Sequence, residues 1–254
     1  MDWDVIIIGA GIAGLTSAIY TARAGKKTLV LEGKVYGGQI INTLSIENWP
    51  GDFKVSGVDL INKVKNQATE LGAEIELEEV EKVEKIEGGF RVVTEDGEYT
   101  AGAVIVAVGA EPRKLSEKQA ADAGKRAISY CATCDGALYK GKPVVVVGSG
   151  NSAKDEIEYL EGIASKVYHI HHDDPIPEDA EAVFVAIGRV PHTEVAKGLV
   201  ELDGDGYIVA GENCETSCPG VFVAGDCRTK SLRQLVTAAS DGAVAANAAV
   251  HYLG

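Results

Sequence analysis

Positive charge and long apolar runs are scarce in this sequence. Its 254 residues carry 24 Lys and Arg against 38 Asp and Glu, which gives a net charge of −14 at pH 7. Because nucleic acids and anionic membranes are also negatively charged, we expect neither as a partner. No apolar stretch reaches transmembrane length. The N-terminal MDWDVIIIGAG enters a strand without a preceding basic region, so we expect no signal peptide.

Cysteine is scarce as well. There are five, two of them in a Cys-x-x-Cys pair, which favours thiol chemistry in a reducing compartment over a disulfide framework. The apolar and charged fractions are ordinary for a globular protein. These features together predict an acidic, cytoplasmic α/β protein.

Glycine, in contrast, is abundant, and the 30 glycines cluster after apolar runs. The run 5–8 predicts a strand buried on both faces; GAGIAG and a helical stretch to residue 24 follow it. The same order recurs in PVVVVGSGNSA, at 143–153. Residues 78–102 alternate between polar and apolar, and Asp96-Gly97 is a typical tight turn, so we expect a small antiparallel meander there.

The first glycine turn has the spacing of a dinucleotide-binding motif. Gly9-x-Gly11-x-x-Gly14 lies between a predicted strand and a predicted helix, and Glu32 ends the next strand. Glycines at these positions allow a tight turn, close approach of a pyrophosphate and close packing of helix on strand. The helix N-terminus then faces the diphosphate, and Glu32 can accept hydrogen bonds from a ribose. A tight turn with no ligand is the alternative interpretation.

Seven motifs follow one another along the chain: VIIIGAGIAG, YGGQI, ENWPG, AVIVAVGAEPR, CATCDG, VVVVGSGNSA and VFVAGDC…RQLVTAASDGAVAA. In these motifs and their order the chain resembles a family, the low-molecular-weight thioredoxin reductases. The resemblance implies two Rossmann-like dinucleotide-binding domains of the three-layer ββα type, the second inserted in the first and strongly shortened here. The implied FAD domain is discontinuous, at 1–111 and 191–254, and the reduced NAD(P)-like domain with the Cys pair spans 112–190. The family habit also implies a homodimer.

The resemblance implies an FAD site and a thioredoxin-reducing dithiol. Cys134 would contact the flavin and Cys131 would attack the disulfide of thioredoxin through a mixed disulfide. Asp135, directly after the pair, could give a proton to a departing thiolate or to the flavin. The residues implied to bind FAD are Gly9, Gly11, Gly14, Glu32, Gly38, Gln39, Asn48, Gly109, Asp226, Arg233 and Gln234, of which Arg233 and Gln234 would approach the isoalloxazine from the final helix.

The Cys pair has two other interpretations. A metal site would need two more ligands, and the remaining pair, Cys214-x-x-x-Cys218, is off the usual zinc spacing. A purely structural disulfide is the second alternative. Two residues between cysteines allow a small disulfide ring that opens and closes easily and can lower the pKa of one thiol. We therefore favour redox catalysis and expect no metal. We interpret Cys214, Cys218 and Cys227 as packed residues or exposed thiols, although Cys227 follows Asp226 and could lie near the flavin.

An unusual segment follows the strand that comes after the second glycine turn. After the predicted strand 167–170 come His171, His172, Asp173 and Asp174, where NADPH-dependent members of the family carry arginines for the 2′-phosphate. Neutral histidines hold phosphate weakly and aspartates repel it. Family members also continue through a helix and several strands before the run that corresponds to AVFVAIG, whereas PIPEDAE bridges directly here. We read the histidines as solvated loop residues, with a metal or pH role as the alternative. The glycine turn can persist for helix packing alone, and the shortening can be natural or engineered.

Nicotinamide is therefore an improbable donor, and ferredoxin is the alternative suggested by relatives that lack the pyridine-nucleotide motifs. Ferredoxins are usually acidic, so an acidic protein needs a local basic patch to attract one. Candidates are Arg113, Lys114, Lys118, Lys125, Arg126, Arg228, Lys230 and Arg233, unless they only form a solvated charged face. Three hypotheses follow: an FAD-dependent thioredoxin reductase fed by ferredoxin or another non-nicotinamide carrier, the same enzyme fed by NADH or NADPH, and a flavin-binding redox sensor without turnover. The intact Cys131, Cys134 and Asp135 set argues against the sensor.

Overall fold

The computed structural model describes all residues, 1–254, and divides them into two compact units. Unit 1 comprises residues 1–110 and 191–254, and unit 2 comprises residues 111–190. Two short strands pair where the chain passes between them: β7 (Ala110–Pro112) and β12 (Arg189–Pro191). No helix is long and apolar enough to cross a membrane.

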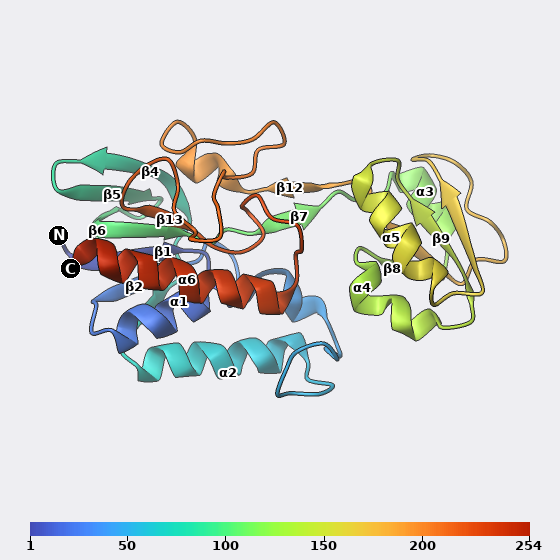
Figure 1. Cartoon of the computed structure of the whole chain (residues 1–254), viewed down its shortest axis with the longest axis horizontal. Coiled ribbons are helices and arrows are strands. Elements are labelled where there is room, and N and C mark those ends of the chain that lie inside the picture. The colour runs from blue at the N-terminus through green and yellow to red at the C-terminus, as the bar shows by residue number, and fades with distance from the viewer. The chain divides into compact units, whose positions relative to one another are not determined.

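Unit 1 is built on a seven-stranded sheet with the order β3-β2-β1-β6-β5-β4, and β13 pairs with β6 (Figure 1). Strands β3, β2, β1, β6 and β13 run parallel, while β4, β5 and β6 form the expected antiparallel meander. The strands are β1 (Trp3–Ile8), β2 (Thr28–Leu31), β3 (Glu74–Glu76), β4 (Val80–Ile86), β5 (Gly89–Thr94), β6 (Glu98–Val106) and β13 (Val221–Val223). The helices are α1 (Ile12–Arg23), α2 (Gly57–Glu70) and α6 (Leu235–Leu253), with short 3-10 turns η1 (Gly38–Asn42) and η3 (Thr193–Ala196).

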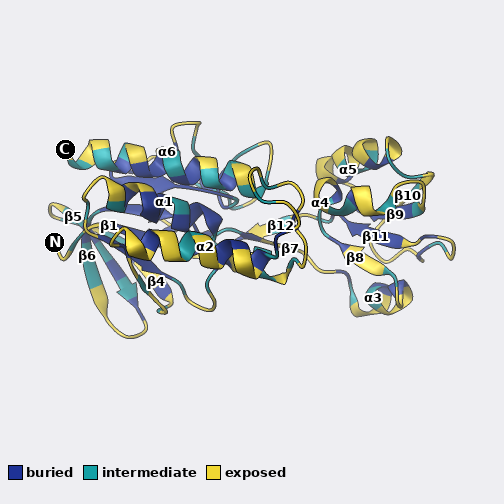
Figure 2. Cartoon of the chain, turned by 90° about the horizontal axis from the view of Figure 1, so that it is seen from below, coloured by how far each residue is buried: buried dark blue, intermediate teal, exposed yellow.

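Alternation along β1 divides the core of unit 1 into two layers. Val5 and Ile7 point to the face that α1 and α6 cover, and Ile6 and Ile8 point to the face packed with residues of β4 and β5. All four are at most 4 % exposed, so the strand is buried on both faces, as its unbroken apolar run predicts (Figure 2). Helix α2 is amphipathic and buries Leu60 and Ile61 while its outer face is exposed.

Unit 2 is a smaller parallel sheet with the order β10-β9-β11-β8. One face packs against α3 and the segment 176–180; the other packs against α4 and α5. Its elements are β8 (Ala127–Ser129), β9 (Pro143–Val147), β10 (Lys166–Ile170), β11 (Ala182–Val185), α3 (Glu117–Ala123), α4 (Ala132–Asp135), η2 (Gly136–Tyr139) and α5 (Asn151–Glu161). Parallel sheets covered by helices in both units confirm the predicted α/β fold class.

Candidate active site

The first glycine turn joins β1 to α1, and its glycines have different reasons to be there. Gly9 has φ 104°, and a Cβ on it would lie 2.5 Å from the carbonyl oxygen of Ala107. A Cβ on Gly14 would lie 1.9 Å from the carbonyl oxygen of Gly9, so helix and turn can pack only with glycine there. Around Gly11, in contrast, a Cβ would meet no atom within 4 Å. The packing of the protein does not require glycine at that position, but a group bound over the start of α1 would.

Glu32 lies beside this turn because β1 and β2 pair in parallel and their carboxyl ends share one edge of the sheet. One of its oxygens accepts a hydrogen bond from the backbone N–H of Ala10 at 2.9 Å, and the other accepts from that of Lys34 at 3.2 Å. The carboxylate is thus held at the turn by two backbone donors. This is the position from which an acidic side chain reaches a ribose in dinucleotide-binding folds.

The segment after β2 returns to the same turn. The N–H of Gly37 donates to the carbonyl of Ala10 at 2.9 Å, and a Cβ on Gly38 would lie 3.9 Å from the Cα of Gly11. The side-chain amide of Gln39 donates to the carbonyl of Ala110, next to Gly109. Gly109 has φ 68° and, like Gly11, open space where a Cβ would lie.

The start of α6 brings in the remaining predicted residues. The amide of Asn48 donates to the side-chain oxygen of Gln234 at 3.0 Å. Gln234 is the N-cap of α6, in a capping box with Thr237, and the helix begins at Leu235. Gln234 is therefore the N-cap of the final helix and Arg233 precedes it, so neither residue lies within the helix as expected. Their approach to the flavin stays a prediction. Arg233 donates to the carbonyl of Asp226 at 3.4 Å, and its guanidinium lies 4.3 Å from the centre of the Tyr207 ring.

A buried ionic cluster, which the sequence interpretation missed, fixes this loop to α6. The carboxylate of Asp241 accepts from Arg228 at 2.7 and 3.0 Å and from Lys230 at 2.7 Å. It also accepts from the N–H of Gly225 at 3.1 Å, immediately before Asp226. Burial alone would raise the pKa of Asp241, but the hydrogen bonds from Arg228 and Lys230 outweigh it and hold the pKa below its ordinary value. One sequence signal could have indicated this cluster: Asp241 is an aspartate inside an otherwise apolar helix, and a buried charge needs partners.

These contacts also correct the predicted basic patch. Arg228 is 8 % exposed, and the side chain of Lys230 is 6 % exposed, so both are buried and paired with Asp241 rather than facing a partner. Arg126 is also engaged within the protein, because its guanidinium donates to the carbonyls of Ala180 at 2.8 Å and Glu178 at 2.9 Å. The exposed basic residues that remain from the predicted set are Arg113, Lys114, Lys118 and Lys125, all in unit 2.

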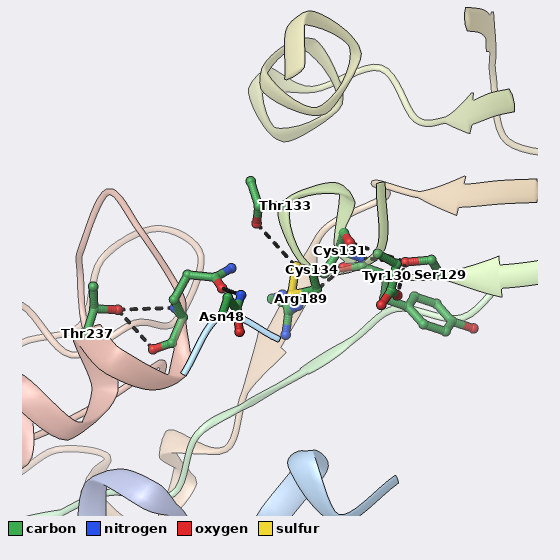
Figure 3. The surroundings of a disulfide bond; sticks show 10 residues. Asn48, Ser129, Tyr130, Cys131, Thr133, Cys134, Arg189 and Thr237 are labelled. Carbon is green, nitrogen blue, oxygen red and sulfur yellow. Dashed lines mark hydrogen bonds between the residues drawn. A yellow bond between two sulfur atoms is a disulfide. The ribbon is translucent and has the colours of Figure 1, made fainter. Parts of the chain in front are cut away.

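The Cys-x-x-Cys pair lies on the first turn of α4 in unit 2, where Cys131 and Cys134 form a disulfide (Figure 3). Cys131 is half-buried and Cys134 is exposed. The N–H groups of Cys134 and Asp135 both donate to the carbonyl of Cys131, at 3.2 and 3.1 Å, so the helical turn brings the two sulfur atoms together. The hydroxyl of Thr133 lies 3.4 Å from Cys131 Sγ.

Asp135 is held against the same turn by Ser129, which the sequence interpretation also missed. The Ser129 hydroxyl donates to Asp135 Oδ2 at 2.7 Å and accepts from the N–H of Cys131 at 3.2 Å. A single side chain therefore links the carboxylate to the first cysteine. Figure 3 shows Ser129 close to Cys131. A carboxylate kept this close to a dithiol is positioned for proton transfer when the disulfide opens. No sequence signal marks Ser129, because serine is common before any turn.

Comparison with known proteins shows the family to which a chain with these residues belongs. The family described as pyridine nucleotide-disulphide oxidoreductase matches residues 3–178 and 173–242. The chain belongs to this family. It is 39 % identical to a thioredoxin reductase of Treponema pallidum, over 99 % of this chain and 97 % of that protein. The resemblance to thioredoxin reductases is thereby confirmed.

Two solved structures extend the comparison. The thioredoxin reductase of Streptococcus pyogenes is 33 % identical, with a TM-score of 0.91 over 99 % of this chain and 98 % of that one. A ferredoxin-flavin thioredoxin reductase of Clostridium acetobutylicum is 29 % identical, with a TM-score of 0.64 over 100 % of this chain and 98 % of that one. The chain is therefore an oxidoreductase, a flavin disulfide reductase of the thioredoxin reductase type, with a redox-active Cys pair.

Members of the pyridine nucleotide-disulphide oxidoreductase family bind FAD, and the residues of unit 1 fit it. The open space at Gly11 and Gly109 leaves room for a group to approach the backbone, and the N-cap of α1 has no side-chain cap to compete for its first N–H groups. Glu32 is already held beside that turn. Bound FAD supplies an acceptor that takes up electrons and passes them as a pair to a disulfide.

The other three cysteines do not have the properties of redox thiols. Cys214, Cys218 and Cys227 are free and buried. Burial raises the pKa of Cys214 to about 11 and that of Cys227 to about 12. A buried thiol with a raised pKa is unreactive, because the thiolate is the nucleophile. No group of three or more His, Cys, Asp or Glu side chains is arranged to hold a metal.

The second glycine turn joins β9 to α5. A Cβ on Gly148 would lie 2.2 Å from the carbonyl oxygen of Ala186, so packing alone requires that glycine, whereas a Cβ on Gly150 would meet open space. His169 Nε2 lies 2.7 Å from the carbonyl oxygen of Gly148. His171 and His172 are exposed, as predicted for loop residues, and Asp174 caps the N–H of His171 at 2.9 Å.

Proposed function

We propose that this protein reduces thioredoxin through FAD and the Cys131–Cys134 pair, and that its flavin takes electrons from ferredoxin or another non-nicotinamide carrier. The observation that carries the choice of donor is the segment 171–180. It follows the carboxyl end of β10, the end of a parallel strand near which dinucleotides bind in this type of fold, and its contacts fasten it to α3.

The segment 171–180 is fixed at both ends. Gln119 of α3, 2 % exposed, accepts from the N–H of Asp173 at 3.2 Å and donates to the carbonyl of Asp174 at 3.0 Å. Asp122 of α3 accepts from the N–H of Ile176 at 2.6 Å. Farther along, Asp179 accepts from the hydroxyl of Tyr168 at 2.7 Å. With Ile176 and Ala180 in the core, the segment closes the sheet against α3 instead of leading into further strands.

Comparison with the relatives supports a missing piece at this point. The two stretches matched by the family meet and overlap at residues 173–178. The alignment to the Treponema protein spans 300 positions, more than the 254 residues of this chain, so that relative carries residues absent here. A nucleotide domain without them lacks part of the wall of a nicotinamide cleft.

The negative charge of the segment 171–180 is also unfavourable for binding a nucleotide phosphate. Asp173 and Asp174 follow β10 directly, and no Lys or Arg occurs in residues 171–181. The hydrogen bond from Ser116 holds the pKa of Asp173 below its ordinary value, which keeps that carboxylate ionised. An ionised carboxylate repels the 2′-phosphate of NADPH. That a similar solved protein is named a ferredoxin-flavin thioredoxin reductase agrees with the proposal.

NADH is a second candidate donor, favoured by one observation. The second glycine turn keeps Gly148 and Gly150, and the space at Gly150 is open. NADH has no 2′-phosphate, so Asp173 and Asp174 oppose it less than NADPH.

The disulfide chemistry needs only groups that unit 2 provides. Two electrons and two protons open the Cys131–Cys134 disulfide. The Cys131 thiolate then attacks the thioredoxin disulfide, forms a mixed disulfide and releases one thioredoxin thiolate. The sulfur of Cys134 next attacks Cys131 Sγ, restores the internal disulfide and releases reduced thioredoxin. Asp135, which accepts from Ser129 at 2.7 Å, is placed to take the proton that Cys131 loses and to pass it to the departing thioredoxin thiolate.

An acidic electron carrier would need a positive surface. The exposed residues Arg113, Lys114, Lys118 and Lys125, called the α3 basic surface here, lie on α3 and its flanks. Opposite charge across an encounter surface raises the association rate more than the affinity. The α3 basic surface therefore suits a transient complex with ferredoxin.

Steady-state turnover tests the proposal. The FAD-loaded protein is mixed anaerobically with oxidised thioredoxin and given chemically reduced ferredoxin, NADPH or NADH, and the new thioredoxin thiols are counted. We expect turnover with ferredoxin and none with either nucleotide. Turnover with NADH alone would favour the second candidate. If none of the three donors led to new thioredoxin thiols, the thioredoxin assignment would be refuted.

A further inference from the structure

Glu156 on α5 has a carboxylate that is partly buried and incompletely paired. The backbone N–H of Ala132, the first residue of α4, donates to it, while its Oε2 is buried and has no hydrogen-bond partner. Ala132 itself is 1 % exposed. The N-cap of α4, Cys131, makes no side-chain cap of its own, so Glu156 supplies from another helix the acceptor that this turn lacks.

The charged and titratable groups around Glu156 come from three elements. Arg189 on β12 attracts the carboxylate and donates to the carbonyl of Tyr130 at 3.3 Å, just before the redox turn (Figure 3). The turn itself carries Cys131, Cys134 and Asp135, and Asp135 is already engaged by Ser129. On α5, Tyr159 packs against Gly136 at the end of the turn.

The balance of these effects leaves the carboxylate easily protonated. Burial raises the pKa of Glu156 to about 7, and the hydrogen bond from Ala132 and the attraction of Arg189 only partly oppose the rise. The residue therefore exchanges a proton in the pH range in which thiols of redox pairs ionise.

We propose that Glu156 is a positioning residue of the disulfide reductase: it anchors the first residue of the redox turn, and the charge on its carboxylate sets the pH at which the reduced cysteine pair forms its thiolate. This inference rests on the proposed function for its biological meaning. As a carboxylate, Glu156 opposes a neighbouring thiolate. When Cys131 loses its proton and Glu156 gains one, the site keeps a single negative charge, and no electron moves.

The expected size of the effect follows from the geometry of the chain. Cys131 immediately precedes the residue whose N–H touches Glu156, which puts its sulfur within roughly 10 Å of the carboxylate. One unit charge at that distance, with an effective dielectric constant of about 20, shifts an ionisation midpoint by about one pH unit.

The test compares Glu156→Gln with wild type. Glutamine keeps an acceptor for Ala132 but carries no charge. The matched control is Glu158→Gln, an exposed carboxylate on the same helix. The FAD-loaded proteins are reduced with a dithiol, and the rate of iodoacetamide modification of Cys131 and Cys134 is followed from pH 5 to 9 by mass spectrometry. We expect the midpoint of Glu156→Gln to fall by about one pH unit and that of the control to stay unchanged.

Equal midpoints in all three proteins would overturn the proposal and leave Glu156 as a packing residue. A second measurement needs no variant: a reduced-minus-oxidised infrared difference spectrum of the wild type at pH 7.5 should gain the carbonyl band of a protonated carboxyl group. Absence of that band would also overturn the proposal. Neither measurement uses ferredoxin, nicotinamide or thioredoxin, so failure of the proposed function and failure of this inference are seen separately.

Discussion

Asp241→Asn is the substitution that should most weaken unit 1. The asparagine has nearly the same shape but removes the one anion that faces Arg228 and Lys230. Two buried cations then lose their partner, and the N–H of Gly225 loses a charged acceptor. Because Gly225 precedes Asp226 and Arg228 and Lys230 lie in the same loop, the predicted FAD contacts should loosen together with the fold.

The magnitude follows from burial. The side chains of Arg228 and Asp241 are only 10 % and 9 % exposed, so water cannot replace the lost partner. Removal of one partner from a buried ion pair costs about 3–5 kcal/mol. For a domain of this size each kcal/mol lowers the melting temperature by about 2–4 °C, so we expect a loss of roughly 10 °C.

The dependence on pH has a definite sign. The pKa of Asp241 lies below its ordinary value, so its contribution to stability is complete above about pH 4 and is lost as the pH falls through the lowered value. The difference in unfolding free energy between wild type and Asp241→Asn should therefore be constant from pH 5 to 8 and shrink below pH 4.

Urea unfolding followed by circular dichroism, with FAD release measured by fluorescence, tests this reasoning. The matched control is Glu84→Gln, which breaks a more exposed cluster in which Arg91 donates to Glu84 at 2.5 and 3.0 Å. The control should lose far less stability, because solvent screens that pair. Equal losses for the two variants, or a stable Asp241→Asn that holds FAD normally, would refute the account of the buried cluster.

Two further predictions concern the reaction. Cys134→Ser should keep FAD but reduce no thioredoxin, whereas Cys218→Ala, at a buried free thiol, should leave turnover intact; turnover in Cys134→Ser would rule out the dithiol mechanism. Lys118→Glu should slow flavin reduction by ferredoxin several-fold at low ionic strength, with the difference vanishing in high salt, because the α3 basic surface acts by steering. Lys85→Glu, exposed on β4 of unit 1, is its matched control in stopped-flow, and equal slowing in both would place the ferredoxin contact elsewhere.

The fold class was predictable because its signals are local. The unbroken apolar run of β1 shows burial on both faces, and Gly14 is required by a contact of less than 3 Å with Gly9, within one strand–turn–helix unit. The antiparallel meander follows from alternation and a short turn. Such features depend on a few neighbouring residues, so the sequence displays them directly.

The polar contacts around the redox turn were not predictable, because they join residues that packing alone brings together. Nothing local shows that Glu156 accepts from Ala132, or that Gln119 holds a segment more than 50 residues away. The basic patch was predicted wrongly for the same reason. The sequence shows Arg228 and Lys230 as two cations, but it does not show that both contact Asp241 inside the core.

The most direct test of the central claim is an anaerobic titration of the FAD-loaded protein, with the visible flavin absorbance as the signal. Reduced ferredoxin, NADPH and NADH are added in separate experiments. We expect ferredoxin to bleach the flavin within the time of one turnover, and neither nucleotide to do so at saturating concentration. Fast bleaching by NADPH or NADH would rule out a non-nicotinamide donor as the sole source of electrons, and would mean that the shortened unit 2 still forms a working nicotinamide site.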